Sequence, residues 1–163
     1  MSYPTDRIAG RLATVIQQQT QPTPVSCTHT CIAMALGRPV QSLGLDINRP
    51  FHPLTLGYWL AVEWGIWMRR CDRSEPVMRR AVYVVGIRSQ NKVGVDHSVL
   101  LDTRQVDPLD DPAMNGDWWD PNKGRGDDVV WVGQVSPCSI LDMVELIDFH
   151  KRGDPTAEQP QEE

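Results

Sequence analysis

Residues 21–37 read QPTPVSCTHTCIAMALG, and the rest of the chain is expected to be organised around this stretch. A polar run punctuated by prolines ends at Cys27, where an apolar segment with helical spacing begins. Ser26 or Thr28 can cap the first helical turn, and Gly37 stands just past the last apolar residue, where a glycine commonly ends a helix. The pattern therefore predicts a helix that carries Cys27 at or near its N-terminus.

A cysteine at a helix N-terminus has a chemical advantage over one that only fills a core. The unpaired backbone N–H groups and the positive end of the helix dipole stabilise the thiolate, which is the nucleophilic form of cysteine. We therefore interpret Cys27 as a nucleophile, with a buried structural cysteine as the alternative. Cys31 lies one helical turn later and is expected to face the core.

A histidine suited to partner this thiol occurs in residues 93–102, which read VGVDHSVLLD. His97 precedes an apolar run that is typical of a strand, so its ring can reach a groove while the strand is anchored in the core. In that position it can serve as the general base, or as the imidazolium of an ion pair with the Cys27 thiolate.

An acidic residue that accepts the second ring N–H would fix the tautomer and orientation of His97. Two Asp-Pro steps offer such a residue, at Asp107 and Asp120. A tight hairpin that turns near residues 102–103 would place Asp107 opposite His97, whereas Asp120 requires residues 108–117 to form an insertion. The prediction leans slightly to Asp107 and keeps both, with Asp96 as a weaker third candidate.

In these motifs the sequence resembles the papain-like cysteine peptidases, especially the bacteriocin-processing peptidase domains of ABC transporters and their stand-alone relatives. Their pattern is a Gln six residues before the nucleophile, then Cys-Gly-x-Ala-Cys-x-Ala-Met, later a His that opens a strand, and then Asp-Pro. Gln21 stands six residues before Cys27, and Cys31 and Met34 fall in register. The resemblance covers roughly residues 17–121. It departs from the pattern at Thr28, which replaces the usual Gly, and at Thr30, which replaces the usual small residue.

The resemblance implies a papain-like α+β domain in which N-terminal helices pack on a C-terminal antiparallel sheet. It also implies a cysteine peptidase or related thiol amidohydrolase that acts through a Cys-His-Asp triad on a peptide or protein substrate, without a cofactor. Gln21 would donate its amide to the oxyanion. The same residues admit deamidation or acyl transfer, as in some toxins or effectors of bacteria or phages. A catalytically inactive binding module is the main alternative, because the β-branched Thr28 could crowd the nucleophile.

Composition excludes several other classes of protein. The chain has 163 residues and a net charge of −5, which argues against nucleic acid as the main partner. No segment resembles a signal peptide or reaches the length of a membrane span, so neither export nor a membrane partner is expected. The four cysteines are irregularly spaced, which favours a reducing cytoplasm over a disulfide scaffold. We expect one domain over residues 1–150, a disordered acidic tail over residues 151–163, and no large pro-segment.

A zinc site is a further alternative, built from Cys27, His29 and Cys31 with Cys71 as a fourth ligand. Alternate positions on a helix diverge by about 200°, so the first three side chains could converge only in a loop. The predicted helix therefore argues against a metal.

The remaining elements follow from periodicity and from turn residues. The predicted helices and strands, in chain order, are helices over Thr5–Gln19 and Pro53–Glu63, strands over Ile66–Cys71 and Ala81–Arg88, a strand from near His97, a strand over Val129–Val135, and a last helix over Ile140–Phe149. Helices followed by strands favour an α+β domain with the active groove between the two parts.

Overall fold

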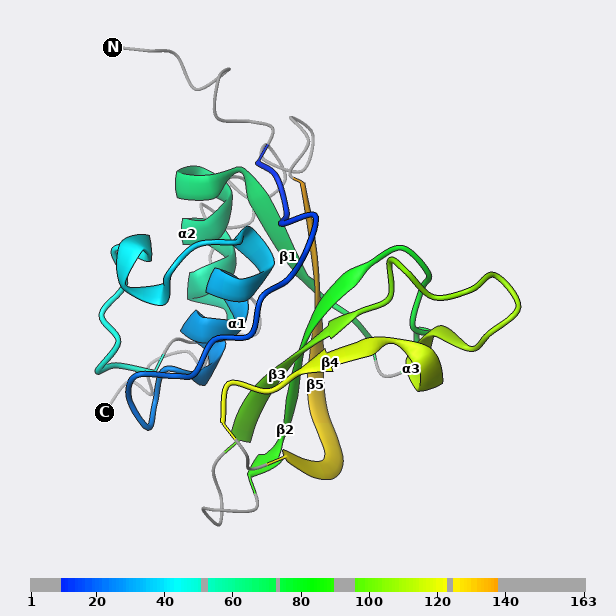
Figure 1. Ribbon diagram of the computed structural model, residues 1–163. Coiled ribbons are helices and arrows are strands. Elements are labelled where there is room, and N and C mark those ends of the chain that lie inside the picture. Colours follow the sequence, from blue (N-terminus) through cyan, green and yellow to red (C-terminus); the bar gives the residue numbers. More distant parts are fainter. Residues whose placement is uncertain (1–9, 51–52, 73, 90–95, 123–124, 138–163) are drawn as a thin grey trace, which may run out of the picture.

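The computed structural model describes residues 10–50, 53–72, 74–89, 96–122 and 125–137. In this part of the chain the centre is an antiparallel five-stranded sheet in the order β1-β5-β2-β3-β4. The strands are β1 (Ile66–Arg70), β2 (Val82–Ser89), β3 (Asp96–Asp102), β4 (Asp117–Trp119) and β5 (Arg125–Pro137). Figure 1 shows the helices α1 (Cys27–Leu36) and α2 (Pro53–Trp64) together on one side of the sheet. The prediction of an α+β fold is confirmed.

Helix α1 begins at Cys27 and stops before Gly37, as the sequence predicts. Gly37 adopts a left-handed conformation with φ of 67°, and its N–H donates to the carbonyl of Met34. The next N–H, from Arg38, donates to the carbonyl of Ala33, so the last turn is closed by two backbone hydrogen bonds. Every residue from 28 to 35 is buried, because the helix is enclosed by the sheet and by other segments of the chain.

Two apolar cores lie on opposite sides of the central strands, because side chains alternate along a strand. Val82 and Val84 of β2 join the main core with α1, while Tyr83 and Val85 belong to the second core. The largest members of the main core are Ile16, Ile32, Met34, Leu43, Leu60, Ile66, Met68 and Leu100. Helix α1 is thereby fixed against β2 and β3, and α2 packs on β1.

The predicted helix over Thr5–Gln19 is wrong for residues 10–19, which form no helix, while residues 1–9 lie outside the described chain. The Ala13 N–H donates instead to the carbonyl of Ala35 at the end of α1. Ile16 is buried, whereas Val15 is 73% exposed, so the apolar residues of this segment do not share one face. A second such bond runs from the Gly10 N–H to the carbonyl of Gly65, so these backbone groups bond to neighbouring elements and not along a helix.

The connection between β3 and β4 decides where the second Asp-Pro step lies. Strand β4 pairs with the end of β3, so residues 103–116 form a long loop rather than a tight turn. This loop contains the short helix α3 (Pro112–Asn115), whose N-cap Asp111 accepts hydrogen bonds from the backbone of Ala113 and Met114. Asp120 follows β4 directly and returns toward the start of β3.

The segment after α1 contains the 3-10 helix Val40–Leu43. The predictions for Pro53–Glu63 and for the four strands are confirmed to within a few residues at most ends, although β5 begins earlier, at Arg125. The predicted helix Ile140–Phe149 and the predicted tail lie outside the described residues.

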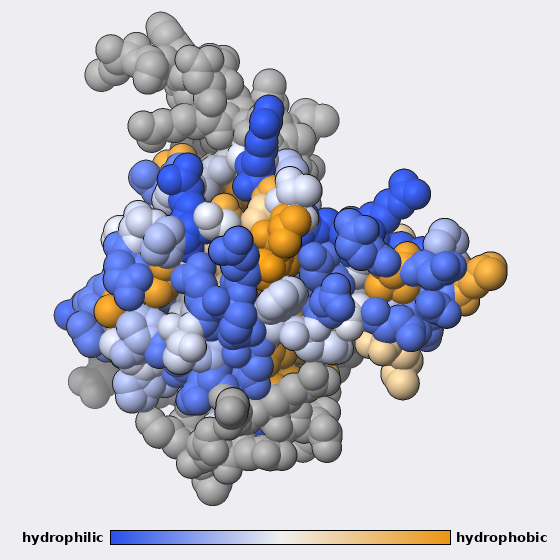
Figure 2. Space-filling model, in the orientation of Figure 1, coloured by the Kyte–Doolittle hydropathy of each residue, from blue (hydrophilic) through white to orange (hydrophobic). Residues whose placement is uncertain are grey.

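The described surface is largely polar. On the face seen in Figure 2, hydrophobic side chains form small separate groups among hydrophilic ones. The most exposed large hydrophobic residues come from different parts of the chain: Val15, Val62, Met78, Leu109, Met114 and Val129. Within the described residues, no helix combines the length and the apolar character that a membrane crossing requires.

Candidate active site

Cys27 occupies the first position of α1, where the helix dipole favours a negative charge. Burial acts to raise the pKa of this thiol. Hydrogen bonds from the His97 side chain and from the backbone and hydroxyl of Ser98 outweigh that effect, and the pKa of Cys27 is lowered. The thiol is half-buried, so it stays accessible to a small reagent.

The other described cysteines behave in the opposite way. Cys31 is fully buried, and this burial raises the pKa of its thiol well above the ordinary value. Burial also raises the pKa of Cys71, although Arg69 partly counteracts it. Among the cysteines that the structure describes, Cys27 is therefore the one whose surroundings favour the reactive thiolate.

His97 stands near the start of β3 and is 6% exposed. Its Nε2 lies 2.5 Å from Oδ1 of Asp120, which leaves Nδ1 for Cys27. Burial lowers the pKa of His97, but hydrogen bonds and charge interactions with Cys27 and Asp120 raise it to about 9. A lowered thiol pKa beside a raised imidazole pKa favours a thiolate–imidazolium ion pair.

Asp120 reaches His97 because β4 ends one residue earlier and lies beside β3. The carboxylate Oδ1 also accepts a hydrogen bond from the Asn122 N–H, at 2.9 Å. The Asp120 carbonyl accepts from the Gln18 side-chain amide at 2.7 Å, which ties this loop to the segment before α1. These contacts hold both the carboxylate and the backbone of Asp120 in place.

The predicted position of Asp107 opposite His97 is wrong. The residue that pairs with His97 is Ile87 of β2, and Asp107 lies in the long loop after β3. Asp107 is exposed, and its Oδ1 accepts the N–H of Leu109. The physical reason is the loop: with residues 103–116 between β3 and β4, the strand that returns to His97 arrives at Asp120 instead. The weaker candidate, Asp96, is also exposed.

Gln21 lies in the loop that leads to α1, and its backbone N–H donates to the carbonyl of Pro121 at 3.0 Å. The segment beside Asp120 therefore also adjoins Gln21. The side-chain Nε2 donates to the carbonyl of Thr23 at 2.9 Å, so one of its two amide N–H groups is engaged within the loop. The buried Oε1 accepts no hydrogen bond from the described residues. The oxyanion role of Gln21 stays a prediction.

Ser98 was not identified as a site residue from the sequence. Its hydroxyl lies 2.8 Å from the hydroxyl of Thr28, and both side chains are buried. Thr28 is thus engaged with β3, which counts against the idea that it crowds Cys27. The one signal in the sequence is that Ser98 directly follows His97 and Thr28 directly follows Cys27. This signal is weak, because every candidate residue has a neighbour in the chain.

The zinc alternative finds no support in the described residues, where no three His, Cys, Asp or Glu side chains are grouped as metal ligands. His29 Nε2 lies 3.1 Å from the carbonyl of Asp46, on a different side of α1 from Cys27.

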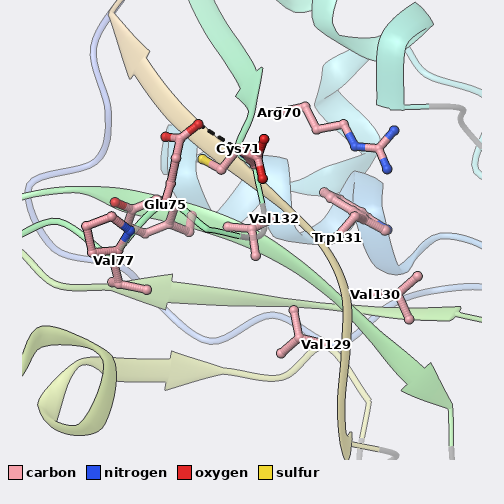
Figure 3. A pocket seen from close by; sticks show the side chains of 11 residues that line it. Arg70, Cys71, Glu75, Val77, Val129, Val130, Trp131 and Val132 are labelled. Carbon is pink, nitrogen blue, oxygen red and sulfur yellow. Dashed lines mark hydrogen bonds between the residues drawn. The ribbon is translucent and has the colours of Figure 1, made fainter. Parts of the chain in front are cut away.

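A separate pocket of about 290 Å³ lies at the edge of the sheet, where β5 extends past the end of β1. Figure 3 shows Arg70 and Trp131 on one side of this pocket and Glu75 and Val77 on the other. It also contains Cys71, whose thiol pKa is raised by burial. The residues that line this pocket include none of the candidate catalytic residues.

Comparisons of the chain with known protein families, with curated proteins and with solved structures found no match. The function proposed below therefore depends on the residues of the site and on their geometry.

Proposed function

We propose that this protein is a papain-like cysteine peptidase, or a related thiol amidohydrolase, that cleaves an amide bond in a peptide or protein. Cys27 is the nucleophile, His97 is the acid and base, and Asp120 orients His97. The observation that carries the proposal is the connected chain of three groups: a thiol at a helix N-terminus, bonded to a histidine whose Nε2 meets a carboxylate at 2.5 Å.

The first half of the proposed reaction breaks the amide. The Cys27 thiolate attacks the carbonyl carbon, and a C–S bond forms as the carbonyl π electrons move to oxygen. The His97 imidazolium then gives its proton to the amide nitrogen. The electrons on the oxyanion re-form the C=O bond, the C–N bond breaks, and the amine leaves a thioester on Cys27. The Cys27 backbone N–H and the Gln21 amide are the proposed donors to the oxyanion; such donors are worth about 3 kcal/mol each.

The second half restores the enzyme. His97, now neutral, takes a proton from water, and the oxygen of that water attacks the thioester carbon. The C–S bond breaks, which releases a carboxylic acid and returns the thiolate beside the imidazolium. Asp120 accepts the Nε2–H of His97 throughout, so that Nδ1 stays directed at the sulfur. All steps use groups of this chain and water.

Deamidation and acyl transfer share the first half and differ only in the nature of the amide or in the nucleophile that resolves the thioester. No contact among the described residues favours either over hydrolysis, so peptide hydrolysis remains the primary proposal. The same chemistry requires a reduced Cys27, in keeping with the cytoplasmic location expected from the sequence.

The test is the pH dependence of Cys27 alkylation by iodoacetamide, followed by intact mass and peptide mapping. We expect one fast-reacting thiol, at Cys27, with an apparent pKa below that of an ordinary cysteine. His97→Ala should raise that apparent pKa, because it removes the side-chain hydrogen bond and the charge that stabilise the thiolate. His29→Ala is the matched control: it removes a buried histidine of α1 that contacts Asp46, and it should leave the alkylation profile unchanged.

An ordinary, slow reaction at Cys27 in the native chain would overturn the proposal and favour an inactive binding module. If the thiol is activated, the chain is next incubated with a mixture of peptides of mixed sequence, and new peptide termini are identified by mass spectrometry. Cys27→Ala should abolish those termini.

A further inference from the structure

The residues that follow the nucleophile and the base are joined to each other. Thr28 comes directly after Cys27, and Ser98 comes directly after His97. Their hydroxyl oxygens lie 2.8 Å apart although the residues are 70 positions apart in the chain. A hydrogen bond at this place links the first turn of α1 to the start of β3, the two elements that carry the reacting groups.

We propose that Thr28 and Ser98 are positioning residues, whose paired hydroxyls hold the start of α1, which carries Cys27, against the start of β3, which carries His97. This inference rests on the proposed function of Cys27 as a nucleophile. It assigns a role to Thr28, which replaces the glycine of the pattern that the sequence resembles, and to Ser98.

The pKa of Cys27 agrees with a place for Ser98 beside this thiol. Burial raises the pKa of Cys27, and the His97 side chain and Ser98 both lower it. In the bond between Thr28 and Ser98 either hydroxyl can donate its proton, so the bond joins α1 to β3 whichever hydroxyl is the donor.

The surroundings of this hydroxyl pair keep competing water away. Thr28 is 9% exposed and Ser98 is 3% exposed. On the next strand, Gly86 stands opposite Ser98, and the Trp131 indole occupies the space that a side chain at residue 86 would fill. A buried hydroxyl that loses its partner is costly, so the pair is expected to persist in the native state.

The experiment measures the apparent pKa and the rate constant of Cys27 alkylation by iodoacetamide in the full chain and in Thr28→Val, which removes the hydroxyl and keeps the shape. We expect the apparent pKa to rise and the rate constant near neutral pH to fall by about fivefold, the factor that one lost neutral hydrogen bond typically gives. Thr28→Ser restores a hydroxyl and should return both values toward those of the native chain. Ser98→Ala should change both values in the same direction as Thr28→Val and by at least as much, because it removes the other partner of the same hydrogen bond and a side chain that itself lowers the pKa of Cys27.

The matched control is Thr30→Val. Thr30 is a buried threonine of the same helix, but its hydroxyl donates to the carbonyl of Ser26 at 2.8 Å and does not reach Ser98. This variant should lower the melting temperature as Thr28→Val does, while the alkylation profile of Cys27 stays native. If Thr28→Val fails to fold, Ser98→Ala and its comparison with Thr30→Val test the same bond from the strand.

The outcomes separate this inference from the proposed function. An unperturbed Cys27 in the native chain overturns the proposed function itself. An activated Cys27 whose profile is the same in the native chain, Thr28→Val and Ser98→Ala overturns the positioning role and leaves the proposed function standing. An equal change in Thr30→Val would show that the variants act by general loosening of α1, and would also overturn the positioning role.

Discussion

The hydrogen bond between His97 and Asp120 determines which ring nitrogen faces the thiol. With Nε2 held by Oδ1 of Asp120, the imidazole presents Nδ1 to Cys27. Burial lowers the pKa of His97, and Cys27 and the Asp120 carboxylate together raise it. At the scale of single residues, Asp120 therefore influences both the orientation and the charge of His97.

Asp120→Asn should weaken this influence while it keeps the shape of the side chain. An amide oxygen can still accept the Nε2–H, but it carries no charge, so the pKa of His97 should fall and the apparent pKa of Cys27 should rise. We expect amide hydrolysis to slow by about 10²-fold or more, the usual scale for a misdirected general base. Titration of the His97 ring by NMR and the alkylation profile of Cys27 report the two pKa values.

The matched control for this substitution is Asp107→Asn, since Asp107 stands in the other Asp-Pro step and bonds only within its own loop and to Arg79. Both pKa values and the rate should stay native. A loss in Asp107→Asn equal to that in Asp120→Asn would contradict the assignment of Asp120 as the third member.

At the scale of elements, the site depends on the close approach of three strands beneath α1. Gly86 of β2 pairs with Ser98 of β3 on one side and with Trp131 of β5 on the other. An ideal Cβ at residue 86 would lie 2.0 Å from Nε1 of Trp131. The glycine is therefore required by space, not by backbone conformation.

Gly86→Ala should force the Trp131 ring away from its place and lower the free energy of unfolding by about 1–3 kcal/mol, as overpacking of a core generally does. Urea denaturation followed by tryptophan fluorescence measures the change. Gly57→Ala is the comparison, because Gly57 is in helix α2 and its nearest outside atom, the carbonyl oxygen of Met68, is 3.5 Å from the ideal Cβ. There alanine should be tolerated or should stabilise by up to about 1 kcal/mol. Equal effects of the two substitutions would contradict the spatial requirement at Gly86.

At the scale of the whole molecule, the ion pair contributes to stability in two opposing ways as pH changes. The pKa of His97 is raised from 6.5 to about 9, so its contribution is complete below pH 6.5 and is lost as pH rises through about 9. The pKa of Cys27 is lowered from 9.0, so its contribution is complete above pH 9.0 and is lost as pH falls through the folded value. Over the interval between, one contribution decreases with pH while the other increases, so their effects on the pH slope of stability partly cancel.

Cys27→Ala removes the contribution of the Cys27 thiolate to stability. The pair of His97 and Asp120 remains, so the free energy of unfolding should decrease as pH rises above 6.5, by at most about 1.4 kcal/mol per pH unit. The native chain should show a smaller slope. Urea denaturation at several pH values measures both, and His97→Ala in the Cys27→Ala background is the control that should flatten the curve. An identical slope with and without His97 would show that other groups cause the pH dependence.

The sequence by itself determined the local features of this protein. The apolar run from Cys27 and the glycine at residue 37 specify a helix with the cysteine at its N-terminus, and the β-branched runs specify the strands, because these signals act over a few neighbouring residues. It also supplied Cys27 and His97 as candidates, since each occupies a place where its chemistry is favoured.

Only the tertiary structure decided among the long-range alternatives. The choice of Asp120 over Asp107 depended on the length of the loop after β3, and no local pattern fixes such a length. Residues 10–19 do not form the predicted helix, because backbone N–H groups of this segment bond to the ends of other elements. The Thr28–Ser98 bond joins positions 70 residues apart. Contacts of this kind arise from the packing of α1 on the sheet, where the free energy of the whole core outweighs the preference of any one segment.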